Sequence, residues 1–544
     1  MMRITNSMMT ANSKSNLNIN KTNADKLNTM TSSGQKITRP SDDPVVAIRA
    51  MRLNTSLTEL EQYGGKNIPD ADAWFTDTET ALSQTDGILS DIREKLNQAS
   101  SEENVTSNVK DILEELKQLR NQFYALGNSD SAGRTVFTGY RTGEMLTFME
   151  QDKIEYNIEQ HFTKDDLRIE NYVAGTASID KNGVAFDGTD ELTTYQEEEI
   201  SSQKYYRLRL AYDDIDMPAN EADRKINLDY TDEAGNPKGS IELNIVELNG
   251  KKPSDIDAIY TGGGCVIKET GEVILSKEDY DKLIQAGDIS LSYNKTNWEK
   301  GDLRPEHYFK CFTPKVEEDP RTYSPTYPDG IEYNYNRVDA EGNPTTKKAT
   351  DLDPSETNPD ANVKGFKEQE LTYEIAFNQS IAINIHANDV YSHDIGRDID
   401  ELISITQQMA NVEAKQSDIE KAIENETDTT KLDQLNANLA AIKKERAYVK
   451  EKMHSMYTSA ISSFKGYSDD INKQISNVGA LTSRLEMTKN RVKDQKNNVK
   501  KLADQNINAD IAETALDFKN AQLALEAAQL AAGKISNQTL LNYI

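Results

Sequence analysis

The sequence predicts an elongated α+β protein in which N- and C-terminal helices pair as a coiled coil or helical bundle and a β-rich middle region is inserted between them. Apolar residues recur at helical spacing in both ends of the chain, but not between about residues 150 and 395. Most of the prolines and both cysteines lie in that middle region. The apolar set (AVILMFWYC) makes up only 36% of the 544 residues. This is a thin supply for the core of one globular body, so we expect a surface-rich chain.

Residues 1–45 carry only a narrow apolar stripe. Leu17, Ala24 and Leu27 recur near helical spacing in a stretch that is otherwise rich in Asn, Ser and Thr. A stripe of this width buries too little surface to stabilise a lone helix, and it suits a seam against a partner helix. We therefore predict an axial segment that is disordered in the free monomer and ordered on assembly.

Residues 46–150 are predicted to be mostly helical. Asp43 is a natural N-cap, and Pro44 fits the first turn of the helix that follows. The pair Asp42–Asp43 is therefore better explained by helix capping than by ligand binding. Gly64, Gly65 and Pro69 weaken the continuation of this helix, and helical spacing then returns up to about residue 123.

Residues 151–395 are predicted to form a β-rich outer region of one or two small domains. Alternating stretches at 205–212, 240–246, 272–275 and 371–385 have the pattern of strands. Acidic loops separate them, and the cluster at 351–360 lacks the Gly and Glu of an EF-hand loop. For Cys265 and Cys311, two free thiols are favoured over one disulfide.

Residues 396–470 are predicted to be helical, with an inserted hairpin broken at residues 424–430. Residues 471–544 form the C-terminal coiled-coil helix, in which Val478, Leu485, Val492 and Val499 repeat every seven residues. An Ala-rich stretch containing Leu523 and Leu530 follows, and we expect the end to be disordered in the monomer. The heptad alone leaves open an intramolecular bundle, a homodimer or a seam for another partner.

Composition excludes several classes of function. The formal net charge of -29 disfavours nucleic acid and anionic membranes as partners. No apolar run is long enough to cross a membrane, and the N-terminus has no apolar core of a cleaved signal peptide, so the default address is cytosolic unless another export route exists. The five histidines are scattered, and Gly262–Gly264 lacks a phosphate-binding pattern. We therefore expect no catalytic, metal or cofactor site.

Motifs at both ends resemble one family. The run Arg39, Pro40, Ser41, Asp42, Asp43, Pro44 is similar to the RPSDDP signature of hook–filament junction proteins (hook-associated protein 3), which belong to the bacterial flagellin superfamily. The segments 2–5, 133–142, 478–486 and 510–513 and the end Leu540–Ile544 resemble that family in the same order. Flagellins usually carry KDDAAG in place of the first motif. The resemblance covers about 1–150 and 465–544.

The resemblance implies a structural, non-enzymatic protein of the bacterial flagellum. It would be exported unfolded through the flagellar type III channel without a cleaved signal peptide. Outside the cell it would form a ring between the first hook-associated protein and flagellin. A flagellar export chaperone would bind its C-terminal helix, and the chain would be monomeric before assembly, without cofactors.

The expected assembly seam combines apolar positions of both ends. It consists of Leu17, Ala24, Leu27, Val478, Leu485, Val492, Val499, Leu523 and Leu530.

Two alternatives to a junction protein remain. The first is a flagellin filament subunit, and the second is a flagellin-like secreted protein with a catalytic insert.

Overall fold

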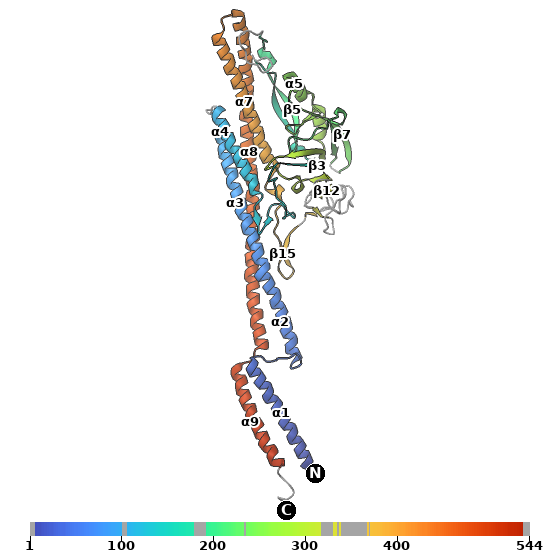
Figure 1. The fold of residues 1–544 in the computed structure, drawn as a ribbon, viewed down its shortest axis with the longest axis vertical. Coiled ribbons are helices and arrows are strands. Elements are labelled where there is room, and N and C mark those ends of the chain that lie inside the picture. The colour runs from blue at the N-terminus through green and yellow to red at the C-terminus, as the bar shows by residue number, and fades with distance from the viewer. Residues whose placement is uncertain are drawn as a thin grey trace, which may run out of the picture. The chain divides into compact units, whose positions relative to one another are not determined.

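A computed structural model describes residues 6–100, 106–178, 192–232, 235–316, 330–334, 337–338, 367–368 and 370–536. The chain falls into two compact units (Figure 1). The first comprises Met1–Asp72, Tyr373–Ile381 and Leu481–Ile544, and the second comprises Ala73–Thr372 and Ala382–Ala480. The acidic cluster at 351–360 and the motifs at 2–5 and 540–544 lie outside the described residues.

The first unit pairs the two ends of the chain. Helix α1 (Asn6–Ser33) lies beside α9 (Ile511–Ser536), and the amide of Asn20 donates to the carbonyl of Ala524 at 3.4 Å (Figure 1). The connection that follows α1 also lies beside the connection that precedes α9. Lys36 N donates to Ile507 O at 2.7 Å, and Ala509 N donates to Gly34 O at 2.9 Å. The predicted pairing of the terminal helices is confirmed.

Helix α2 (Pro44–Gln62) begins where the sequence predicts. The Asp43 carboxylate accepts hydrogen bonds from the amides of Val45 at 3.0 Å and Val46 at 3.1 Å. The expected weakening at Gly64–Gly65 takes the form of a π-helical turn, η1 (Tyr63–Asn67), which leads directly into α3 (Ile68–Ala99). Pro69 has no N–H and crowds the carbonyl four residues back, and the wider turn absorbs both effects.

Two long helices bury heptad positions. Helix α8 (Thr429–Ile507) buries one residue every seven from Tyr457 to Val492. The helix predicted over 471–544 is not continuous, because α8 ends at Ile507 and α9 begins at Ile511. Helix α8 forms the predicted hairpin with α7 (His393–Asn425), because the break at Glu426–Asp428 separates the two. Helix α3 has two such rows, which are Ile68, Phe75, Leu82, Leu89, Leu96 and Ala71, Thr78, Thr85, Ile92, Ala99.

In the second unit, α4 (Thr106–Leu126) packs against the start of α7. The hydroxyl of Tyr124 donates to Ser392 O at 2.9 Å and accepts from Gly396 N at 2.8 Å. Arg120 forms an ion pair with Asp400 beside it. The motif segment at 133–142 lies close by, with Phe137 fully buried against the ring of Tyr391.

The middle region of the second unit forms one ten-stranded sheet. Its order is β12-β11-β3-β10-β6-β7-β8-β9-β5-β4, in which β7 and β8 run parallel and the other neighbours run antiparallel. Trp298 is its most enclosed aromatic residue, stacked on Phe148 at 4.9 Å. The strands are β3 (Asp152–Phe162), β4 (Arg168–Ala174), β5 (Ser201–Arg209), β6 (Lys225–Thr231), β7 (Pro237–Val246), β8 (Cys265–Ile267), β9 (Glu272–Leu275), β10 (Asp288–Trp298), β11 (Lys310–Pro314) and β12 (Gly330–Asn334).

Smaller elements complete the chain. The stretch predicted as a strand at 371–385 is a hairpin of β15 (Thr372–Ala376) and β16 (Gln379–Ala382), whose turn places Asn378 at a φ of 53°. Cys265 and Cys311 are buried free thiols, as predicted. The other elements are α5 (Pro253–Gly262), α6 (Lys277–Leu283) and the two-residue strands β1 (Asp130–Ser131), β2 (Arg134–Thr135), β13 (Arg337–Val338) and β14 (Lys367–Glu368).

Candidate assembly surfaces

Most of the predicted seam on α8 is buried within the chain itself. Val478, Leu485 and Val492 are each 1% exposed, and Val499 is half-buried. Side chains that are already covered in the single chain offer no free surface to another subunit. The heptad of α8 therefore serves packing within the chain, which was one of the alternatives that the sequence left open.

The seam residues on α1 lie on one face of that helix. Ala24 is buried, and Leu17 and Leu27 are half-buried, on the helix that packs beside α9. On α9 the covered positions are the half-buried Phe518, Ala521, Leu525, Ala528, Ala532 and Ile535. The covered face of α9 thus combines three alanines with three larger apolar side chains, and the alanines allow the two helices to approach closely.

Leu523 and Leu530 lie on the opposite side of α9. Together with Leu516 they form a seven-residue repeat, and they are 61% (Leu516), 58% (Leu523) and 70% (Leu530) exposed. At 3.6 residues per turn, Leu523 lies about 200° around the helix from Ala521 and from Leu525. We call Leu516, Leu523 and Leu530 the α9 outer stripe. Among the described residues, none covers this apolar face of helix α9.

A second uncovered apolar row lies on α2. Val45, Ile48 and Met51 follow one another at three-residue spacing, and all three are exposed, whereas Ala47 and Ala50 are buried. The sequence interpretation placed these residues on a helix but did not recognise the row as a surface. The spacing alone was the available signal. Exposed apolar rows that are larger than scattered single residues are typical of protein interfaces.

The RPSDDP run shapes the entry into α2. The Asp42 carboxylate accepts from the amides of Arg39 at 2.9 Å and Thr38 at 3.2 Å, and these bonds lower the pKa of Asp42. Asp43 caps the helix, whereas Arg39, Pro40, Ser41 and Pro44 are exposed. Asp43 thus has the capping role that the sequence predicts, whereas Asp42 does not cap the helix but fixes the turn at Thr38–Arg39 beside the α2 row.

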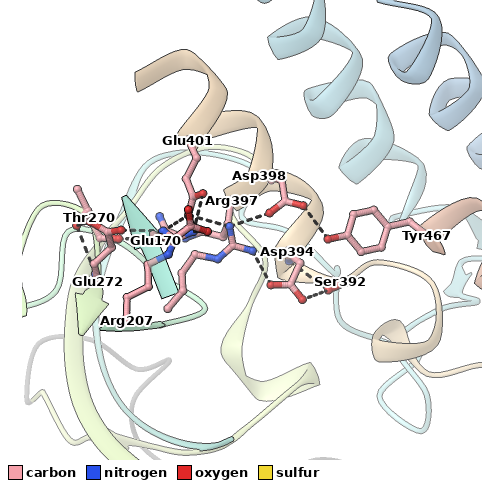
Figure 2. Close-up of polar contacts among 12 residues, drawn as sticks. Glu170, Arg207, Thr270, Glu272, Ser392, Asp394, Arg397, Asp398, Glu401 and Tyr467 are labelled. Atoms are coloured by element: carbon pink, nitrogen blue, oxygen red, sulfur yellow. Dashed lines mark hydrogen bonds and ion pairs between the residues drawn. The ribbon is translucent and has the colours of Figure 1, made fainter. Parts of the chain in front are cut away.

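A buried charge cluster attaches the sheet to α7 within the second unit. Figure 2 shows Arg207 on β5 pointing toward Glu272 and Glu401, with N–O distances of 2.7 and 2.8 Å. Arg209, on the same strand, pairs with Asp394 and Asp398 at 2.8 Å and with Glu401 at 3.0 Å. On α8, the hydroxyl of Tyr467 donates to Asp398 at 2.9 Å (Figure 2).

The cluster is held in its charged form. Burial acts to raise the pKa of Glu401, but Arg209 and Arg207 outweigh burial and hold that pKa at about 2. Burial acts to lower the pKa of Arg207, and the nearby Glu401 raises it above its ordinary value. Removing one partner would leave an uncompensated buried charge, so the cluster fixes where β5 meets α7.

The α7–α8 hairpin supports the sheet at a second place. The carboxylate of Glu445 on α8 accepts from the amide of Ala177 at 3.2 Å and the hydroxyl of Thr176 at 3.2 Å. Asn438, also on α8, accepts from Tyr195 N at 2.7 Å and donates to Thr193 O at 2.9 Å. The helical insertion near 400–460 thus extends the scaffold on which the segments flanking β4 and β5 rest.

The described residues contain no group of three or more His, Cys, Asp or Glu side chains placed to hold a metal ion. Within the same residues, no helix combines the length and the apolar character needed to cross a bilayer.

Comparisons with known proteins match the two ends of the chain. Residues 4–142 match the bacterial flagellin N-terminal helical region, and residues 464–544 match the bacterial flagellin C-terminal helical region. The two ends of the chain are thus similar to the terminal helical regions of bacterial flagellins. The predicted resemblance is confirmed, and the matched regions contain α1, α2, α9 and both uncovered apolar rows.

Two curated relatives are each similar to about a quarter of the chain. Flagellar hook-associated protein 3 of Salmonella typhimurium is 30% identical over 142 residues, which are 26% of this chain and 44% of the relative. A flagellin of Clostridium tyrobutyricum is 29% identical over 128 residues, 24% of this chain and 34% of the relative. The chain thus spans less than half the length of the curated relatives it matches.

One solved structure aligns along most of this chain. It is flagellar hook-associated protein 3 from Legionella pneumophila, which is 12% identical and covers 84% of this chain and 98% of its own. The TM-score of 0.27 is too low for any argument to rest on this alignment.

Proposed function

We propose that this chain is a structural, non-enzymatic part of the bacterial flagellum that joins the hook to the flagellin filament. The observation that carries the proposal is the uncovered α9 outer stripe, which lies within the matched flagellin C-terminal region. The RPSDDP run and the hook-associated relative favour the junction over the filament. In this proposal, α9 and α2 bind neighbouring subunits and the sheet of the second unit faces outward.

The proposed route and partners follow from the same assignment. The chain leaves the cell unfolded through the flagellar type III channel and acts outside it. It assembles as a ring, with the first hook-associated protein on one side and flagellin on the other. Before export it is a monomer held by a chaperone at its C-terminal helix. Deletion of the last 40 or so residues, which begins near the end of α8, should abolish both chaperone binding and filament attachment.

The test of the proposal is complementation in the source bacterium. A strain that lacks this chain should make hooks without filaments and release flagellin into the medium, and re-expression of the chain should restore filaments. The variant Leu516→Gln, Leu523→Gln, Leu530→Gln should fold normally but fail to restore filaments. Ile169→Gln, which replaces an exposed apolar residue in the second unit, is the matched control and should restore them. Normal filaments on the deletion strain would overturn the proposal.

A filament subunit is the second candidate, supported by the similarity to the Clostridium flagellin. Purified chain that grows into long filaments from added seeds would establish this candidate. The third candidate, a secreted protein with a catalytic insert, predicts hydrolase activity in residues 150–395. Loss of this activity with a metal chelator would indicate a metal-dependent hydrolase, and its survival would indicate a metal-independent one.

A further inference from the structure

The second unit contains a cavity of about 770 Å³ that no assembly role explains. It lies between the segment 140–150, which overlaps the end of the motif at 133–142, and residues of strands β3, β11 and β12. Pockets of about 300–1,000 Å³ are the size that small ligands occupy.

Three polar atoms of side chains that line this cavity have no hydrogen-bond partner among the described residues. They are Oε2 of Glu306, Oγ1 of Thr313 and one terminal nitrogen, Nη1, of Arg141. Glu306 is only 2% exposed, and its other oxygen lies 2.8 Å from Nε of Arg304. An unpaired buried polar atom costs about 1–3 kcal/mol, so a cavity wall with three of them is suited to a polar ligand.

Aromatic faces line the same cavity. Arg141 lies over the ring of Tyr333, with its Cζ 4.9 Å from the centroid, and Arg304 lies over the ring of Phe148 at 5.3 Å. Tyr140 is exposed and Tyr156 is buried in the lining. Phe148 stacks on Trp298 and lies under Arg304, and Tyr156 is 1% exposed, so the accessible ring surface comes from Tyr140 and the half-buried Tyr333.

The charges of the lining narrow the ligand class. Glu144, Glu150 and Asp152 add to Glu306, so carboxylates outnumber the two guanidinium groups, and an anionic ligand would be repelled. The unpartnered set contains a donor on Arg141, an acceptor on Glu306 and a hydroxyl on Thr313. Hydroxyl groups of a ligand supply donors and acceptors at the same atoms, and they satisfy this mixed set without adding charge.

We propose that this cavity binds an uncharged saccharide, whose hydroxyl groups pair with Glu306, Thr313 and Arg141 while an apolar sugar face packs on the aromatic rings. The site lies in the sheet-bearing unit, so it gives the chain a ligand-binding activity in addition to its proposed place in the flagellum.

The test uses the full-length chain and four disaccharides, which are maltose, cellobiose, lactose and chitobiose. Binding is measured by saturation-transfer NMR and by the rise in melting temperature at millimolar sugar. We expect at least one disaccharide to bind, and Thr313→Val to weaken that binding about tenfold, because it removes one hydroxyl while keeping the shape. Tyr333→Leu, which removes a ring face, should also weaken it.

The matched control is Thr231→Val. Thr231 lies on β6 of the same sheet and has a buried hydroxyl without a partner among the described residues, but it does not line the cavity. It should leave sugar binding unchanged, and both valine variants should fold because neither breaks a bond of the described structure. Failure of all four sugars to bind would overturn the proposal. So would equal binding by the Thr313 variant, or binding of free lysine or arginine in place of sugars.

Discussion

At the scale of single residues, the second unit depends on a few buried charges with specific partners. Arg207 reaches Glu272 on the neighbouring strand and Glu401 on α7, so one side chain joins a sheet to a helix far away in sequence. Such pairs contribute little relative to apolar residues of the same shape, but they are costly to break because an unpaired charge remains.

Arg207→Met should lower the free energy of unfolding of the second unit by about 3–5 kcal/mol, because it leaves Glu272 buried without its cation and Glu401 with Arg209 alone. Urea unfolding followed by tryptophan fluorescence measures this, since Trp298 lies in the sheet core. Lys225→Met is the matched control, because it breaks an exposed pair with Glu242 between two strands of the same sheet. The control should change stability by no more than about 0.5–1 kcal/mol. Similar losses in both variants would contradict the role of the cluster.

His393 should make the second unit sensitive to mild acid. It is buried among the rings of Tyr212, Tyr308 and Phe309, and burial lowers its pKa to about 3 from the ordinary 6.5. The unfolded chain therefore binds a proton that the folded chain does not, and stability is lost as the pH falls from about 6.5 toward 3. Between pH 7.5 and 5 this histidine should cost about 2 kcal/mol.

The test compares His393→Phe with the unchanged chain in urea at both pH values. The variant should lose about 2 kcal/mol less on acidification. The control His454→Phe, at an exposed position of α8, should lose as much stability between the two pH values as the unchanged chain. An unaltered pH dependence in the His393 variant would show that this histidine is not the buried neutral group described here.

At the scale of elements, the sequence predicts the terminal helices, the heptad of α8 and the hairpin break well. It overlooks the apolar heptad row of α3 from Ile68 to Leu96, and it misses the second row because Thr78 and Thr85 occupy buried positions there. Their hydroxyls donate to the carbonyls four residues earlier, at 2.7 Å to Trp74 and 2.7 Å to Ala81. Because each hydroxyl has this hydrogen bond, the threonines can be buried at low cost. Apolar spacing cannot reveal a polar residue that the helix itself satisfies.

The sheet was only partly predictable for a related reason. Four predicted stretches correspond to β5, β7, β9 and the β15–β16 hairpin, but the central partners β3 and β10 were not identified. Both strands alternate polar and apolar residues, which is a strand signal that the sequence interpretation overlooked, whereas their pairing over more than a hundred residues leaves no local signal. The buried charge cluster joins segments just as distant, so sequence spacing gave no sign of it.

The π-helical turn between α2 and α3 makes two neighbouring glycines respond differently. A Cβ on Gly65 would meet nothing within 4 Å, whereas a Cβ on Gly64 would lie 3.2 Å from Cγ1 of Val492. Gly65→Ala should stabilise the first unit by about 1 kcal/mol by reducing the freedom of the unfolded chain, and Gly64→Ala should gain clearly less. Thermal unfolding followed by far-UV circular dichroism measures both. Equal gains would contradict the close approach at Gly64.

At the scale of the whole molecule, the few apolar residues of the chain are used differently in the two units. The second unit has a large sheet core, whereas most of the large exposed apolar side chains described lie in the first unit, on α1, α2, α8 and α9. In a chain with so few apolar residues, leaving them uncovered at the ends is consistent with surfaces that other subunits cover.

Limited proteolysis of the free monomer should remove both ends first. The α1–α9 pair covers mainly small or half-buried side chains, so its local opening should cost less free energy than opening of the sheet. We expect a surviving fragment from about residue 45 to about residue 470, identified by mass spectrometry. Ends that resist the protease as long as the sheet does would argue against ordering on assembly.

The central claim, that the α9 outer stripe contacts a neighbouring subunit, is tested most directly by cysteine cross-linking in assembled flagella. Leu523→Cys places a thiol on the outer stripe, and Ala528→Cys places one on the face that α9 covers, while the two native thiols are buried. With a photo-reactive maleimide attached to each introduced thiol, the account predicts that the Leu523 variant forms covalent links between subunits in assembled flagella, but not in the free monomer, and that the Ala528 variant forms none. Cross-links absent from the assembled Leu523 variant, or equally abundant in both variants, would contradict it.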